Sequence, residues 1–359
     1  MSAFLSGGIN LVVALAILVV LVLVHEIGHF VTARLAGVRV HEFGIGFPPR
    51  ARVLGSDGET VYTLNWLPLG GFVRLEGEEG ESDDPRSFVR QSVWRRTVIL
   101  AAGVAMNLVL AFVIFVVIAA AFEPLAVTKV VEVQPGSPAA SAGLVAGDVI
   151  TAIDGRDFPF FDNQAPTDVL RQHPGGTVTL TVRHPSGGVT QTPVTLRDEA
   201  AIQAGKGALG ITALLELQGT AQRSPPQALQ VGTARTLDAC GLILRTLGDF
   251  VVRLAQNPGQ APPIAGPIGV VEAVGTVRTQ APPVVLFWLM GLLSANLAVL
   301  NILPIPPLDG GHILVGFVQA ITRNRISAGL ERAFYLVGFV LIFALIIWVS
   351  YFDLLRVGA

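Results

Sequence analysis

Long apolar stretches alternate with polar segments along this chain, and four of them are long enough to cross a lipid bilayer, which takes about 20 residues. They cover residues 10–30, 98–122, 284–303 and 333–352. The second contains one polar side chain of note, Asn107. The pattern predicts a polytopic α-helical membrane protein with four transmembrane helices.

The first apolar stretch has an unbroken run from Leu11 to Val24, which is also a feature of secretory signal peptides. A signal peptide has basic residues before its apolar run and a cleavage site with small residues after it. Here no basic residue precedes Leu11, and the run continues directly into His25 and Glu26. We therefore expect a membrane span.

Residues 38–75, between the first two spans, have the pattern of a β-hairpin. Residues 61–64 are strand-like, and Asp57-Gly58 is a hairpin turn signal. The N-terminal membrane part, residues 1–124, therefore combines two spans with a hairpin. Six carboxylates follow between Glu76 and Asp84, and we expect them to form a solvated loop.

After the second span the chain begins a small β-rich domain over residues 125–196. Strand-like runs open it at 127–133 and close it at 189–196. Three short motifs lie between these runs, in the order Pro135 to Ala139, Ala142 to Leu144, and Gly147-Asp148. The order resembles a PDZ domain of the bacterial protease type, and another small β domain is the alternative.

Residues 197–283 connect this domain to the third span, and within them 228–254 have a helical period. Apolar residues fall on one side, and charged residues fall on another at Arg235, Asp238, Arg245, Asp249 and Arg253. The pattern predicts an amphipathic helix that lies on the outer membrane face or packs on the PDZ domain. The C-terminal membrane part, 284–359, then holds the third and fourth spans.

The overall composition agrees with a membrane protein. Of the 359 residues, 52% are hydrophobic and 14% are charged, against about 25% charged in soluble domains. The net charge of −2 gives no reason to expect nucleic acid as a partner. Cys240 is the only cysteine, which excludes a disulfide framework and a cysteine-based metal site.

Basic residues predict the orientation, because they collect in cytoplasmic loops. The loop after the first span carries nine of them: Arg34, Arg39, Arg50, Arg52, Arg74, Arg86, Arg90, Arg95 and Arg96. The loop after the third span carries Arg323, Arg325 and Arg332. We expect both loops in the cytoplasm, and both termini and residues 123–283 outside.

His25, Glu26 and His29 form an H-E-x-x-H motif at the end of the first span. Positions i and i+4 share one face of a helix, so both imidazoles can bind one metal ion with Glu26 beside it. Ionisable groups inside a membrane are costly, and they mark functional sites by default. The alternative is a group of polar residues that caps the helix near the interface.

A hydrolytic zinc site usually has three protein ligands and leaves a fourth position for water. The best candidate for the third is Asp309, which follows three prolines in four residues at the end of the third span. Such a segment cannot continue a helix, and unwound backbone at membrane depth is tolerated only where protein or water covers it. His312 is the alternative third ligand.

These motifs together resemble the site-2 proteases, a family of intramembrane zinc metalloproteases, in the bacterial RseP-like type with a single PDZ domain. The resemblance follows the chain in order through Phe43 to Phe47, Pro68 to Val73, Ala102-Gly103 with Asn107, the PDZ segment, Gly266 to Gly269, Asn296, and Asn301 to Gly311. Val104 departs from it, since the family often has proline there.

The resemblance implies one Zn²⁺ per chain, held by His25, His29 and Asp309, with Glu26 as catalytic acid and base. It also implies that the substrate is held by Asn296, Asn301, Pro304 and Pro306, to which we add Gly70 and Gly71 of the hairpin.

The expected activity is cleavage of single-pass membrane proteins, such as anti-sigma factors or remnant signal peptides, in the bacterial inner membrane. The active site would lie near the cytoplasmic side, and the PDZ domain would lie outside with a peptide or protein as its ligand. Since a helical substrate hides its carbonyls, it would unwind and pair with the 38–75 hairpin as an added strand, unless that hairpin is an ordinary loop.

Two other classes of protein compete with this interpretation. A membrane-anchored PDZ adaptor without catalysis would not need His25, Glu26, His29 and Asp309 together. A transporter is disfavoured because the four predicted spans lack paired repeats with broken helices.

Overall fold

The computed structural model describes residues 2–78, 82–162, 165–257, 259–322 and 328–357. The chain divides into two compact units. Unit 1 contains residues 1–116 and 231–359, and unit 2 contains residues 117–230. Arg323 and Arg325, which contribute to the predicted orientation, lie outside the described residues.

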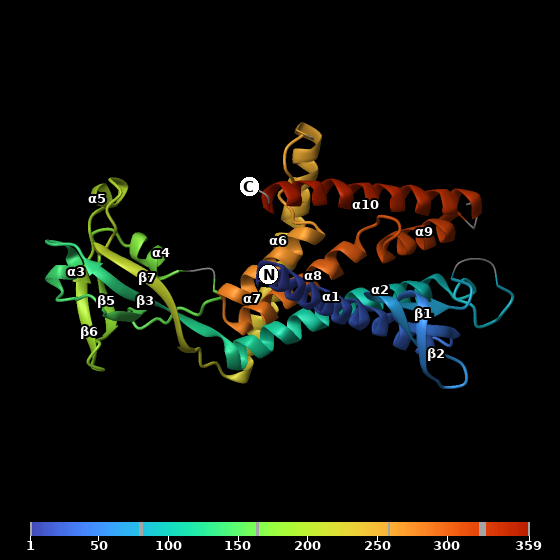
Figure 1. Ribbon diagram of the computed structural model, residues 1–359, viewed down its shortest axis with the longest axis horizontal. Helices are drawn as coiled ribbons and strands as arrows, with labels where there is room; N and C mark the ends of the chain where they lie inside the picture. The colour runs from blue at the N-terminus through green and yellow to red at the C-terminus, as the bar shows by residue number, and fades with distance from the viewer. Residues whose placement is uncertain (1, 79–81, 163–164, 258, 323–327, 358–359) are drawn as a thin grey trace. The chain divides into compact units, whose positions relative to one another are not determined.

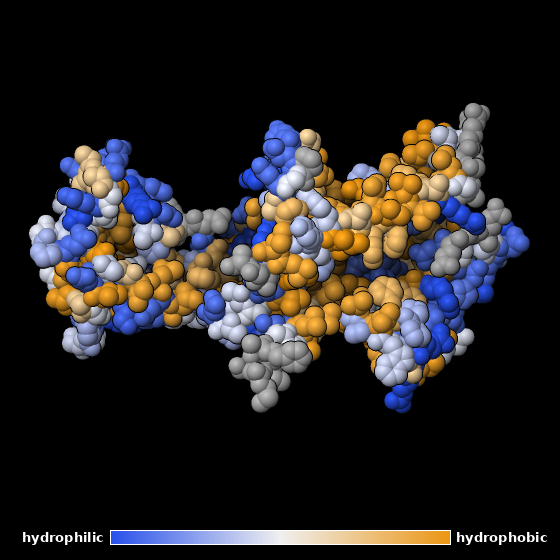
Figure 2. Space-filling view, turned by 45° about the horizontal axis from the view of Figure 1, so that its top comes forward, coloured by the Kyte–Doolittle hydropathy of each residue, from blue (hydrophilic) through white to orange (hydrophobic). Residues whose placement is uncertain are grey.

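Four helices are long and apolar enough to cross a membrane, as the sequence predicts. They are α1 (Ser2–Leu35), α2 (Val93–Val117) with its π-helical continuation η1 (Ile118–Phe122), α8 (Pro283–Ile302) and α10 (Ala328–Val357). In unit 1, hydrophobic surface covers much of the helical part, whereas polar surface collects around the β1 and β2 end (Figure 2).

Three further helices complete the helical part of unit 1: α6 (Pro225–Gln256), α7 (Pro267–Gln280) and α9 (Asp309–Thr322). In α6, Ala239 and Ile243 pack in one buried cluster with Phe115 of α2 and Val299 of α8. The predicted amphipathic helix, residues 228–254, lies within α6, and its residues 231–254 belong to unit 1, where its apolar side contacts α2 and α8.

The Gly266 to Gly269 motif begins α7 against the end of α10. Asp353 of α10 is 2% exposed, and its Oδ2 accepts a 2.9 Å hydrogen bond from the backbone N–H of Gly269. A side chain at Gly266 would press on the same carboxylate. The small residues of this motif thus let a carboxylate from a distant helix satisfy the free N–H groups at the start of α7.

The predicted hairpin is a more complex sheet than two strands. β1 (Val40–Ser56) and β2 (Val61–Leu75) both bend, so residues 40–45 pair with 61–64 on one side and with 71–75 on the other. Residues 50–56 pair with the far edge of 61–65. The result is four antiparallel segments in the order 50–56, 61–65, 40–47 and 71–75, and Gly71 at the start of the last segment lies against Leu23 of α1. Figure 1 shows β1 and β2 near one end of α1.

The acidic stretch after β2 is less solvated than the sequence predicts. Glu76 accepts hydrogen bonds of 2.5 Å from His41 and from the Ser82 hydroxyl. Asp84 pairs with Arg39 at 2.6 Å. These two carboxylates connect the segment after β2 to residues 39 and 41 at the start of β1.

Unit 2 contains one antiparallel five-stranded sheet in the order β6-β5-β4-β3-β7. Its strands are β3 (Pro124–Val133), β4 (Val149–Ile153), β5 (Thr177–Arg183), β6 (Val189–Thr195) and β7 (Ile211–Thr220), and its short helices are α3 (Pro138–Ser141), α4 (Pro166–Arg171) and α5 (Glu199–Gln203). Val130, Ile153, Leu180 and Val182 are the centre of its core. The sheet continues past the predicted boundary at residue 196, because β7 pairs with β3 along most of its length.

Candidate metal centre

His25 and His29 lie one turn apart on α1, and both imidazoles are buried. Their Nε2 atoms are 3.0 Å apart, and the two rings meet edge to face. The unbroken apolar run before His25 makes this part of the chain a regular helix, which places positions i and i+4 on one face. The motif therefore directs two potential ligand atoms to one point.

Asp309 joins them from a segment that is far away in the sequence. Helix α8 ends at Ile302, where the prolines interrupt it, and Asp309 is the first residue of α9. Its Oδ2 lies 3.0 Å from Nε2 of His25 and 3.5 Å from Nε2 of His29. Among the described residues, these three form a group whose ligand atoms all lie within 4.8 Å of one another.

The spacing of these three atoms fits a zinc ion. Nitrogen and oxygen ligands bind Zn²⁺ at about 2.0–2.1 Å in a tetrahedron, which separates the ligand atoms by about 3.3 Å. The observed separations of 3.0 to 3.5 Å lie around that value. Asp309 Oδ2 is also buried, and it has no hydrogen-bond partner among the described residues. Because buried polar atoms normally have a partner, a bound cation would fit this position.

Residues of helix α2 contact both histidines. Nδ1 of His29 donates a 2.9 Å hydrogen bond to the backbone carbonyl of Ile99, and this leaves Nε2 free as a ligand. Gly103 lies against both imidazoles, because a Cβ there would be 2.5 Å from Nε2 of His29. The approach of α2 to α1 requires a second glycine, Gly28, where a side chain would collide with the carbonyl of Ala102.

Glu26 lies beside the two histidines and is partly exposed. The 71–75 segment of the sheet passes next to it: a Cβ at Gly71 would lie 3.7 Å from the Glu26 side chain. Gly70 has a backbone φ of +120° and faces Val22 of α1. Both glycines are buried, and they let a strand run close to the part of α1 that carries His25 and Glu26.

The residues expected to hold substrate have different surroundings. Asn301 lies at the cluster, with its Nδ2 3.3 Å from Nε2 of His25. Asn296 is about 140° around α8 from Asn301, since five helical positions separate them. Pro304 is exposed, whereas Pro306 is buried and packs on Gly338 of α10. The substrate roles of these four residues stay predictions.

His312, the alternative third ligand, is not in the metal-binding group of described residues. Its ring stacks on Tyr335 with centroids 4.3 Å apart, and burial lowers the pKa of its imidazole. Burial opposes ionisation of Asp309, yet the two facing imidazoles hold the pKa of its carboxyl below the ordinary range. An ionised Asp309 is the better metal ligand of the two.

Gly103 entered the sequence prediction as part of the family resemblance without a role, and no role was predicted for Gly28 or Gly338. Gly103, Gly28 and Gly338 each lie where an element passes close to another backbone or to the imidazoles. Small residues within apolar helices are typical of close helix packing in membranes, so their positions were the available signal.

Comparison with known proteins shows the family of this chain. Residues 13–345 match the peptidase family M50. The chain belongs to peptidase family M50. A candidate zinc metalloprotease of Clostridium perfringens is 34% identical over 336 residues, which cover 93% of this chain and 95% of the relative. Another, of Clostridium acetobutylicum, is 31% identical over 96% of this chain and 97% of its own length.

A third relative of this M50 protein, also named a candidate zinc metalloprotease, comes from a Nostoc species and is 31% identical over 94% of this chain and 93% of its own. The family, the relatives and the four apolar helices establish a membrane-embedded zinc metalloprotease of the site-2 protease family. The peptidase family and the zinc metalloprotease names of the relatives favour an enzyme over the adaptor alternative.

Proposed function

We propose that this protein hydrolyses peptide bonds within or beside the membrane spans of single-pass membrane proteins. The observation that carries the proposal is the place of the metal centre. His25 and His29 belong to a 30-residue apolar helix, and Asp309 follows the proline segment that ends another candidate span at Ile302. A substrate therefore meets this centre at the level of the membrane and not in an aqueous domain.

The chemistry assigned to the site is hydrolysis with Glu26 as proton acceptor and donor. When bound by His25, His29 and Asp309, zinc supplies a Lewis acid that activates water and polarises a carbonyl. Glu26 takes a proton from the water and passes it to the leaving amine. We assign to the Asn301 side-chain amide, which lies 3.3 Å from Nε2 of His25, a hydrogen bond to the substrate.

A helical substrate exposes a peptide bond only after it unwinds, and the sheet offers a partner for the unwound chain. Residues 71–75 pair with 40–45 along one edge, and the segment passes over Glu26. An extended substrate that adds to this segment as a further strand would lie next to the metal centre. Gly70 and Gly71, which we assign to the substrate-binding region, let this segment lie close to α1 and Glu26.

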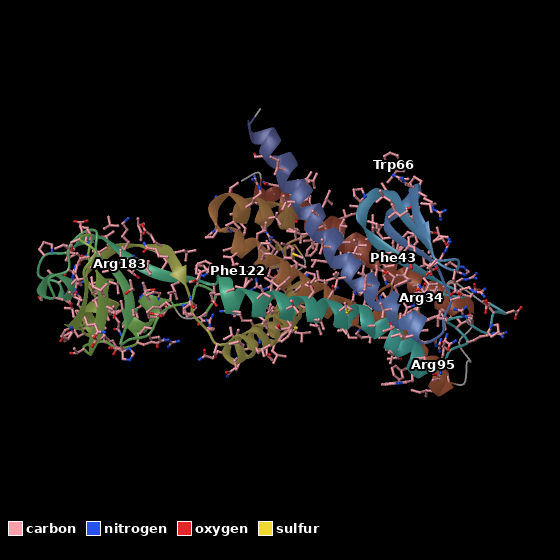
Figure 3. All side chains as sticks on the ribbon, turned by 90° about the horizontal axis from the view of Figure 1, so that it is seen from below. Arg34, Phe43, Trp66, Arg95, Phe122 and Arg183 are labelled. Carbon is pink, nitrogen blue, oxygen red and sulfur yellow. The ribbon has the colours of Figure 1, made fainter. Side chains whose placement is uncertain are left out.

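The sheet also carries apolar side chains that suit contact with lipid. Trp66 is 70% exposed, and Leu69 and Leu54 are more than half exposed. Figure 3 shows Trp66 projecting from the sheet away from Arg34. We assign the sheet to the cytoplasmic side of the bacterial inner membrane, because Arg34 and Arg95 lie at the same end of α1 and α2 as the sheet (Figure 3).

Unit 2 is assigned as an extracytoplasmic PDZ domain with a peptide or protein ligand. In support, β7 is an edge strand of the sheet, and an edge strand pairs readily with an extended peptide. The turn before β7 is formed by Gly210, with φ of +71°, and Arg197 donates a 3.0 Å hydrogen bond to the backbone carbonyl of Gly207 in this turn.

Anti-sigma factors and remnant signal peptides are the proposed substrates of the enzyme.

The test compares Glu26→Gln with Asp309→Asn in purified protein, using a single-pass model substrate in vesicles. Glu26→Gln should lower the cleavage rate by about 10²–10⁴-fold or more, because it removes the general base, and should keep its zinc. Asp309→Asn should lose zinc as well as activity. Near-parental cleavage by Glu26→Gln would overturn the assigned chemistry, and cleavage restricted to soluble peptides would overturn the proposed substrate class.

A further inference from the structure

Asn107 is a polar residue in the middle of the second span, and the chemistry above gives it no role. Its side chain is fully buried, with 0% exposure. Its amide lies 3.3 Å from Nδ1 of His25, on the side of the ring that faces away from the metal-binding atoms. A buried polar group at membrane depth is expensive unless it serves a function.

The metal ligand in both histidines is Nε2, since these atoms face each other and Asp309. A neutral imidazole that binds metal through Nε2 carries its proton on Nδ1, and it needs an acceptor there. His29 has such an acceptor in the carbonyl of Ile99, at 2.9 Å. The group in the corresponding position at His25 is the Asn107 amide.

The two ends of an asparagine amide have the same shape, so the hydrogen-bond network decides which atom faces a partner. With Nδ2 towards His25, the imidazole would accept at Nδ1 and carry its proton on Nε2, where it blocks metal binding. The structure has the amide in this orientation, with Nδ2 towards His25 and Oδ1 buried without a partner among the described residues. With Oδ1 towards His25, the ring donates from Nδ1 and Nε2 is free.

We propose that Asn107 is a positioning residue, whose side-chain oxygen accepts the Nδ1–H of His25 and keeps Nε2 available to zinc. The backbone carbonyl of Asn107 accepts a 2.8 Å hydrogen bond from the hydroxyl of Ser294 on α8. This bond fixes α2 against α8 without touching the imidazole. The inference concerns zinc binding and does not depend on the proposed substrate.

The test measures the zinc affinity of the full-length protein in detergent by competition with a chelator. Asn107→Leu and the smaller Asn107→Ala both remove the acceptor, and each should lower zinc affinity by about 10–100-fold. Asn107→Asp keeps an oxygen facing His25, so its affinity should stay within a few-fold of the parent or rise. Ser294→Ala removes the neighbouring interhelical hydrogen bond and should leave zinc affinity unchanged.

Two further measurements separate positioning from folding. Gel filtration and thermal unfolding of the zinc-free variants report whether α1 and α2 still pack, and Asn107→Ala guards against a clash from leucine. Nitrogen NMR of histidine-labelled, zinc-loaded protein should show His25 protonated at Nδ1. Parental zinc affinity in both Asn107→Leu and Asn107→Ala, equal loss in Asn107→Asp, or a His25 ring bound through Nδ1 would each overturn the proposal.

Discussion

At the scale of single residues, the metal centre depends on missing side chains as much as on ligands. Gly103 lets the backbone of α2 touch both imidazoles, and Gly28 lets α1 touch α2. In a membrane, where lipid is as apolar as leucine, such close backbone contact is a main source of helix association. The two glycines therefore set the distance at which Ile99 and Asn107 meet the histidines.

Gly103→Ala should weaken zinc binding although it changes no ligand. The new Cβ would lie 2.5 Å from Nε2 of His29 and 2.7 Å from Cε1 of His25. Overpacking of this kind costs about 1–3 kcal/mol, so zinc affinity should fall roughly tenfold or more. Gly8→Ala is the matched control on α1, because nothing lies within 4 Å of that position. Unchanged affinity in Gly103→Ala would show that the helices separate easily.

At the scale of elements, one buried carboxylate links the segments of the sheet. Glu42 is 4% exposed; its carboxylate accepts 2.8 Å hydrogen bonds from Arg50 and Thr63 and lies 3.1 Å from Arg74. Each of these residues belongs to a different segment of the bent β1–β2 pair. Burial alone would raise the pKa of Glu42, but the Thr63 hydroxyl and the two arginines lower it below the ordinary value.

Glu42→Gln should loosen the sheet and make it less sensitive to acid. Because the folded-state pKa of Glu42 is lowered, its contribution is present above the unfolded pKa of about 4.3 and is lost as the pH falls through the folded value. The loss at neutral pH should be about 1–3 kcal/mol.

Hydrogen exchange of residues 40–75 at neutral and acid pH measures the effect of Glu42→Gln. Glu216→Gln in unit 2 is the control, since it breaks a surface pair with Lys129. Equal acid sensitivity of the sheet in the parent and in Glu42→Gln would contradict the role given to this carboxylate.

The loop that carries Asp309 is supported by α10 in a similar way. Gly338 faces Pro306 so closely that any side chain there would overlap its carbonyl. Gly338→Ala should move the proline segment and reduce both zinc affinity and cleavage, with the helix content unchanged. Gly329→Ala, on the same helix with open space around it, should behave as the parent. Parental zinc affinity in Gly338→Ala would mean that α10 does not support the metal centre.

At the scale of the whole molecule, the arginines and the apolar helices predict a defined orientation. The loop between the first two spans carries the basic residues that favour the cytoplasm. The second span leads from this loop to unit 2. If the second span crosses the membrane once, unit 2 lies on the side opposite to the loop. The division into two compact units is consistent with a membrane part and a separate domain.

Single cysteines test this orientation after Cys240 is replaced. In intact cells, a membrane-impermeant thiol reagent should label Ser186→Cys in unit 2 and should not label Ser82→Cys, which should react only after permeabilisation. The reverse pattern would place the sheet outside. Labelling of both positions in intact cells would exclude the predicted crossing of the second span.

The sequence by itself predicted the four spans, placed His25 and His29 one helical turn apart with Glu26 beside them, and named Asp309 ahead of His312 as the candidate third ligand. Span length and composition are local properties, and an H-E-x-x-H motif on a helix has only one geometry. Asp309 was also within reach of the sequence, because prolines end α8 at a depth that matches the end of α1.

Only the tertiary structure decided which groups surround these residues. Asn107 meets His25 across 82 positions, and Ile99 meets His29 across 70. The double pairing of residues 40–45, the packing of α6 on α2 and α8, and the contact of Gly338 with Pro306 join segments that are likewise far apart. Local periodicity states which face of an element is apolar, but the partner of that face depends on how the whole chain packs.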